Sequence, residues 1–83
     1  MITKLDENDE YRTSDLGCSS ALVALGFQIE DLDKSSPKRA IFIFRNSADV
    51  IRTVEEYWNG SLSVKAKSFF ETQKWLKSRI YNG

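Results

Sequence analysis

The strongest strand signal in the chain is the apolar run Ala40–Phe44, and it constrains the fold more than any other feature. Ile and Phe favour strands, and apolar side chains at odd and even positions indicate that both faces of the strand are covered. The preceding segment Asp33–Lys38 has turn composition, with Pro37 near its end. Before it, the segment 27–32 opens with alternating apolar and polar residues. These patterns predict a β-hairpin whose second strand lies at the centre of a sheet.

Three helices are expected around this hairpin. Residues 16–25 follow the helix start Thr13-Ser14-Asp15 and end before Gly26, which is suited to a left-handed C-terminal position. A second helix begins at Asn46-Ser47 and ends at Asn59-Gly60. A third is predicted over 65–81. The residues expected to face the core lie at helical spacing: Ala66, Phe69, Gln73, Leu76 and Ile80. Phe70 and Trp75 widen this apolar stripe.

The predicted fold class is α+β, with element order β-α-β-β-α-(β)-α. A short first strand at 10–13 and right-handed crossover chirality favour a small mixed sheet in order 1-3-2, in which strands 1 and 2 flank an antiparallel centre. Residues 62–64 form either a short fourth strand or a linker. Residues 1–9 are predicted to be a flexible acidic N-terminal tail, and 10–83 a single domain.

The composition of the chain argues against several classes of chemistry. Histidine is absent and Cys18 is the one cysteine, so the chain has no internal disulfide, no Cys/His zinc site and no Ser–His or Cys–His pair. We therefore expect no metal, no cofactor and no enzymatic activity. No leader pattern opens the sequence and no apolar run approaches the ~18 residues of a membrane span, so we expect a cytoplasmic protein without a membrane partner.

Charge is unevenly distributed, although the net charge is zero. Residues 1–33 hold two basic and eight acidic side chains, a net of −6, whereas residues 34–83 hold ten basic and four acidic ones, a net of +6. This asymmetry predicts either a dipolar surface or two halves that attract one another on folding.

The basic C-terminal half suggests a nucleic-acid interface, in which cations neutralise phosphates and Trp75 stacks on a base. The alternative is a solvated helix face whose lysine stems cover the core. The candidate residues are Arg39, Arg45, Lys65, Lys67, Lys74, Trp75, Lys77 and Arg79.

Phe42 and Phe44 share one face of the predicted central strand. They form either a stacking platform for single-stranded nucleic acid or ordinary core beneath the last helix. Residues 38–44 loosely resemble the central-strand motif of RNA-recognition domains, but both motif glycines are missing and Ala40 stands where an aromatic is expected.

Large amphipathic rings suggest a second kind of surface. Tyr57 and Trp58 end the second predicted helix, and such rings are enriched at protein interfaces as well as at the edges of small cores. We therefore consider Tyr57 and Trp58 the centre of an alternative protein-interaction surface.

Several segments resemble a family of small uncharacterised domains associated with phages, mobile elements and bacteria. They begin with Tyr-Arg-Thr-Ser-Asp-Leu at 11–16 and continue with Ala-Leu-Gly-Phe at 24–27, Pro-Lys-Arg at 37–39 and Tyr-Trp-Asn-Gly at 57–60. The similarity ends with Leu-Lys-Ser-Arg-Ile-Tyr at 76–81. The resemblance implies an intact small domain and a mobile-element setting, and it assigns no functional residues. We expect a non-enzymatic module that binds nucleic acid or, alternatively, a host protein, as a phage-type inhibitor or adaptor does.

Overall fold

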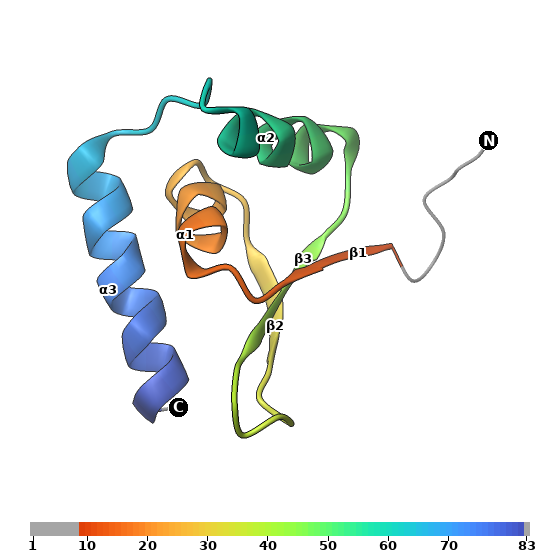
Figure 1. Ribbon diagram of the computed structural model, residues 1–83, viewed down its shortest axis with the longest axis vertical. Helices are drawn as coiled ribbons and strands as arrows, with labels where there is room; N and C mark the ends of the chain where they lie inside the picture. The colour runs from red at the N-terminus through yellow and green to blue at the C-terminus, as the bar shows by residue number, and fades with distance from the viewer. Residues whose placement is uncertain (1–8, 83) are drawn as a thin grey trace.

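The computed structural model describes residues 9–82, which form a three-stranded sheet and three helices (Figure 1). All three helices lie to one side of the sheet or across its upper end, so the fold is α+β. The helices and strands follow the predicted order, without a strand between the last two helices: β1 (Glu10–Thr13), α1 (Leu16–Ala24), β2 (Ile29–Asp33), β3 (Ile41–Arg45), α2 (Ala48–Asn59) and α3 (Ala66–Asn82).

The sheet has the predicted order β1-β3-β2, with β3 at its centre. Both β1 and β2 pair with β3 in antiparallel fashion, so they run parallel to each other and the sheet is purely antiparallel rather than mixed. An irregularity between Ile29 and Asp31 inserts Glu30 as an extra residue in β2. This bulge lets Ile29 pair with Phe44 and Leu32 with Phe42, which places both β2 side chains on one face.

The core forms where β3 meets the helices. Phe42 and Phe44 are fully buried and cluster with Cys18 and Leu22 of α1, Val50 of α2 and Leu76 of α3. A stacking platform on Phe42 and Phe44 is therefore excluded, because both rings point toward the helices and not toward solvent.

Local sequence sets the helix ends largely as predicted. Asp15 itself is the N-cap of α1, since its carboxylate accepts the Cys18 N–H at 2.7 Å; the Thr13 hydroxyl accepts the Asp15 N–H instead of capping the helix. After α1, Gly26 takes a left-handed φ of 106°, and the Phe27 N–H donates back to the Leu22 carbonyl. Ser47 caps α2, and Gly60 ends it with a φ of 82°.

The last helix buries a narrower stripe than its sequence predicts. Leu76 is buried, whereas Phe70 and Trp75 are 59% and 49% exposed and Ala66 is also exposed. The reason is that α3 packs mainly on α1, which is only nine residues long and rich in small side chains. A short helix between α3 and the sheet covers one line of side chains and leaves the flanks of α3 open.

Residues 61–65 form neither strand nor helix. Of the two predictions for residues 62–64, a fourth strand or a linker, the linker is confirmed. Most of the predicted N-terminal tail, residues 1–8, lies outside the described residues. Asp9 is described, and its carbonyl accepts the Asn46 N–H at 3.2 Å, one step beyond the β1–β3 ladder.

We predict that replacing Phe44 by Ala will lower the free energy of unfolding by about 3–5 kcal/mol, because a fully buried ring at the centre of the core is lost. Urea denaturation followed by circular dichroism measures this change. Phe70→Ala is the matched control on an exposed ring of α3 and should cost less than ~1 kcal/mol. Equal losses in the two variants would contradict the position of the core.

We predict that alanine substitution will have different effects at Ser19 and Ser20, two neighbouring residues of α1. Both are buried, but the Ser20 hydroxyl donates to the Leu16 carbonyl at 2.7 Å, whereas the Ser19 hydroxyl has no hydrogen-bond partner among residues 9–82. Because an unsatisfied buried hydroxyl costs about 1–3 kcal/mol, Ser19→Ala should raise the midpoint of urea denaturation. Ser20→Ala should leave it unchanged or lower it. A lower midpoint for Ser19→Ala would show that its hydroxyl has a partner.

Candidate functional site

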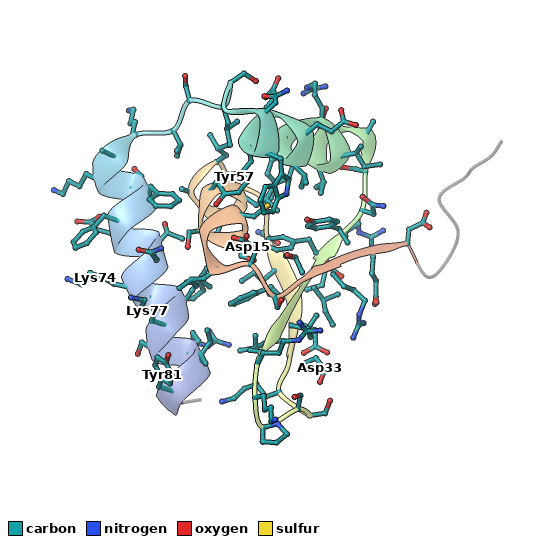
Figure 2. The ribbon with its side chains drawn as sticks, in the orientation of Figure 1. Asp15, Asp33, Tyr57, Lys74, Lys77 and Tyr81 are labelled. Atoms are coloured by element: carbon teal, nitrogen blue, oxygen red, sulfur yellow. The ribbon has the colours of Figure 1, made fainter. Side chains whose placement is uncertain are left out.

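The basic residues predicted on α3 lie on different sides of the helix. Lys74 points away from the sheet, and Lys77 and Tyr81 follow it down the helix toward its C-terminal end (Figure 2). Their spacing of three and four residues keeps them on one face. We call Lys74, Lys77 and Tyr81 the outer face of α3. Lys74 also lies over the exposed Phe70 ring, with its Nζ 5.3 Å from the ring centroid.

Trp75 and Arg79 lie on the other flank of α3, which borders β2. The Arg79 guanidinium stacks on the Trp75 ring at 5.3 Å, and both side chains line a narrow notch together with Ile29 and Leu32. Arg79 also borders a second hollow lined by Glu30 and Asp31. Trp75 therefore stands beside an acidic strand edge and an apolar notch, and a cation already lies on its ring.

Arg39 lies in an open groove of about 460 Å³. In Figure 1 the tip of the β2–β3 hairpin and the C-terminal end of α3 both lie at the lower end of the molecule, and the groove runs between them. We call it the basic groove. Its lining residues come from three parts of the chain: Ser14 and Leu16, then Lys34, Ser36, Pro37, Lys38, Arg39, Ala40 and Phe42, then Ile80 and Tyr81.

The basic groove has an apolar floor and a cationic rim. Leu16, Ala40 and Ile80 are buried or half-buried and supply the floor, and the buried Phe42 also lines the groove. Lys34, Lys38 and Arg39 are exposed and supply three positive charges. No Asp or Glu of the described residues lines it. The groove therefore offers an anion three cations, and it offers a planar apolar group a surface to lie on.

Asp33 is the carboxylate nearest in sequence to this rim, and its partners lie outside the basic groove. The Asp33 carboxylate accepts the Ser35 N–H at 2.9 Å and pairs with Arg12 at 3.1 Å. The Ser35 backbone N–H, and after it the Arg12 guanidinium, lower the pKa of Asp33. Asp33 is thus ionised at neutral pH, and its charge is directed toward Arg12 rather than into the basic groove.

The face of the sheet away from the helices carries mixed charge. Arg12 on β1 pairs with Glu10 at 3.0 Å and with Asp33 on β2 at 3.1 Å, so its side chain crosses β3, which lies between these two strands. Arg45 lies on the same face, opposite Glu10 in the β1–β3 register. Arg45 is thus far from Arg39, on a surface that carries acidic residues as well as basic ones.

Lys65, at the end of the linker, and Lys67, in the first turn of α3, are exposed at the opposite end of the helix from the basic groove. Lys67 lies 3.9 Å from Glu71, one turn further along. Of the eight predicted nucleic-acid residues, Arg39 lines the basic groove, and Lys74 and Lys77 lie on the outer face of α3, which meets the groove at Tyr81. Arg45, Lys65 and Lys67 are remote, and Trp75 and Arg79 are on a separate flank.

The two residues of the predicted protein interface differ in exposure. Tyr57 is half-buried against the core, and its hydroxyl lies beside Gly17 and Asp15 of α1 (Figure 2). Burial, and then the Asp15 carboxylate, raise the pKa of the Tyr57 phenol. Trp58 is 63% exposed and meets the Tyr57 ring edge-on at 5.2 Å. Trp58 is thus free to contact a partner, whereas Tyr57 joins α2 to α1.

The remaining nucleophilic and acidic groups form no recognisable reactive site. Cys18 is buried 4.0 Å from the Tyr11 hydroxyl, and burial raises the pKa of the Cys18 thiol and of the Tyr11 phenol. Residues 9–82 contain no cluster of three or more acidic or cysteine side chains that could hold a metal. Within the same residues, no helix has the length and apolar character needed to cross a membrane.

Sequence reasoning missed Lys34 and Lys38, the two lysines that join Arg39 in the basic groove. They belong to the segment Lys-Ser-Ser-Pro-Lys-Arg, which reads as ordinary turn composition. The available signal was the density of three cations in six residues without a carboxylate. This cluster of cations did not predict that α3 would end opposite the turn.

A three-stranded antiparallel sheet with three helices to one side of it or across its upper end defines a small α+β domain. No curated protein and no solved structure matches the chain. A family model described as "Domain of unknown function (DUF5659)" matches residues 8–82, and the chain belongs to this family.

The contact between Tyr57 and α1 gives a prediction about Gly17. A methyl group on Gly17 would collide with the Tyr57 hydroxyl, so Gly17→Ala should not give the ~1 kcal/mol gain that alanine usually brings to a helix. Combining Gly17→Ala with Tyr57→Phe removes the hydroxyl and should recover most of that gain. A double-mutant cycle of unfolding free energies measures the coupling. Additive effects would mean that the hydroxyl does not press on Gly17.

Proposed function

We propose that this protein is a non-enzymatic binding module for nucleic acid, which it contacts through the basic groove. The observation that carries the proposal is the rim of the groove, where Lys34, Lys38 and Arg39 converge without an opposing carboxylate among the described residues. Phosphate contacts by lysine and arginine supply most of the affinity of sequence-independent nucleic-acid binders.

The outer face of α3 supports a path for the phosphate backbone beyond the groove. Tyr81 belongs both to the groove lining and to this outer face, where Lys77 and Lys74 continue upward along the helix. A strand leaving the groove past Tyr81 would meet these two lysines next. The proposed interface therefore holds five cations: Lys34, Lys38, Arg39, Lys74 and Lys77.

A net charge of zero is compatible with this function because the charges are separated in space. Glu10, Asp31 and Asp33 belong to the sheet, and two of these three carboxylates are paired with Arg12. The basic groove lies at the hairpin tip, beyond this face. A local cluster of one sign raises the concentration of an oppositely charged ligand even where the whole molecule is neutral.

Exposed apolar side chains on α2 favour a second candidate function, a protein-interaction module. Ile51 and Trp58 are seven residues apart, on one face of α2, and both are exposed. This ridge would serve an inhibitor or adaptor of a host protein complex, in keeping with the phage or mobile-element setting that the sequence resemblance implies. In that case Trp58→Ser would abolish capture of the partner and leave nucleic-acid binding unchanged.

The test of the nucleic-acid proposal is fluorescence anisotropy with labelled single-stranded and duplex oligonucleotides between 50 and 200 mM salt, the range over which such contacts lose most affinity. The variant Lys34→Ala/Lys38→Ala/Arg39→Ala should weaken binding strongly. It should also flatten the slope of log affinity against log salt by roughly 2, because about 0.7 is lost per phosphate contact on a single strand.

The matched control removes the same number of charges elsewhere. Arg52→Ala/Lys65→Ala/Lys67→Ala changes three exposed cations on α2, on the linker and at the start of α3, all distant from the basic groove. This variant should keep most of the affinity and nearly all of the salt slope. Equal losses in both triple variants, or no binding by the unaltered protein at 50 mM salt, would refute the proposal.

A further inference from the structure

We infer that the basic groove takes an unpaired base of a single-stranded nucleic acid, with the base on the apolar floor and its phosphates on the rim. This inference rests on the proposed function and makes it more specific: the ligand is single-stranded, and one base enters the groove. It depends on three properties of the groove, namely its volume, its floor and the aromatic residue at its edge.

The volume of the groove is larger than phosphate contacts alone require. About 460 Å³ lies within the range of roughly 300–1,000 Å³ that is typical of small-molecule sites. Lysine and arginine side chains can neutralise phosphates from a flat or convex surface. A hollow of this size beside three cations indicates a ligand that carries a bulky group next to its negative charges.

The floor identifies the chemistry of that group. Leu16 at the start of α1, Ala40 before β3 and Ile80 near the end of α3 present aliphatic surface, and Pro37 adds a further apolar wall. Ser14 and Ser36 are among the same lining residues, and the Ser36 hydroxyl accepts the Lys38 N–H at 3.2 Å. A nucleobase matches this combination, because its faces are apolar and its edges carry hydrogen-bond donors and acceptors.

The phosphate next to such a base would lie on the rim. Lys38 and Arg39 directly precede Ala40 in the chain, so the cations and the floor are joined by the backbone of one strand entrance. Lys34 faces them across the hairpin turn. A base seated at Ala40 therefore has cations on both arms of the hairpin within reach of its own backbone.

Tyr81 supplies an aromatic side chain at the edge of the groove. It is 79% exposed, more than any other large apolar or aromatic side chain among the described residues. Aromatic rings that present a free face to solvent beside cations are the stacking elements of single-strand binders. Trp75, the stacking residue expected from the sequence, lies instead on the β2 flank with Arg79 on its ring.

Duplex nucleic acid cannot use this combination, since its bases are paired and stacked inside the helix. A duplex would present phosphates alone to the rim and leave the floor unfilled. Extrusion of a base from a duplex costs a few kcal/mol, whereas a single strand offers its bases at little cost. The floor of the groove therefore selects single strands.

The experiment compares four fluorescein-labelled probes at one low salt concentration: a single-stranded oligothymidine, its RNA counterpart, an abasic sugar-phosphate oligomer of the same length, and a DNA duplex. Both base-containing single strands should bind at least tenfold more tightly than the abasic oligomer, as stacking of one base predicts. The duplex should resemble the abasic oligomer. Anisotropy measures all four affinities.

Three variants locate the base. Tyr81→Ala should weaken binding of the base-containing strands by about tenfold and leave the abasic oligomer unaffected, whereas Tyr81→Phe should retain full affinity. Ala40→Leu fills the floor and should remove the preference for bases while the salt slope stays unchanged. Trp75→Ala is the aromatic control on the other flank of α3 and should have no effect.

The outcomes separate this inference from the proposed function. If none of the probes binds, the nucleic-acid function itself is wrong. If intact and abasic strands bind equally and Tyr81→Ala has no effect, the groove contacts phosphates only and the base site is wrong, while the proposed function stands. If Trp75→Ala reduces affinity and Tyr81→Ala does not, the base lies at the β2 flank, which also overturns the inference.

Discussion

The structure depends on the burial of Phe42 and Phe44 in the central strand. A sheet of three strands has one strand with partners on both sides, and in this protein β3 carries both ladders and the largest buried side chains. Each helix contributes to the cover over the two rings, through Leu22, Val50 and Leu76. Because α1 lies nearest to the sheet and is short, α3 packs on α1 and extends past its end. The lower part of α3 thereby comes to lie opposite the hairpin tip, where the basic groove forms.

The separation of charge in the sequence becomes a separation in space. The neutral strand β1 and the acidic strand β2 flank β3, and Arg12 links Glu10 to Asp33 across it. This arrangement holds two carboxylates on the face of the sheet away from the helices. Among residues 9–82, the cations of the hairpin tip and of the outer face of α3 form no ion pair with a carboxylate. A neutral protein can therefore present a basic surface at one end.

Much of the fold was predictable because its signals are local. The strand at 41–45, the stops at Gly26 and Gly60 and the serine cap of α2 depend on neighbouring residues alone, and all appear in the structure. The 1-3-2 strand order followed from the two-sided apolar pattern of β3. The inner side of α3 was predicted less well. Periodicity identifies the apolar positions of a helix, but it does not show how many of them a neighbouring helix will cover. Phe70 and Trp75 are exposed for this reason.

The sequence by itself determined the elements, the central strand and the segregation of charge, because each depends on residue type and spacing along the chain. Only the tertiary structure decided which cations act together. Lys34, Lys38 and Arg39 became one rim because a hairpin folds its two arms together, and Tyr81 joined them because α3 ends at the same place. Arg45, Lys65 and Trp75 were separated from them by the same packing. Proximity between residues some forty positions apart is set by how helices stack on a sheet, and no local pattern records it.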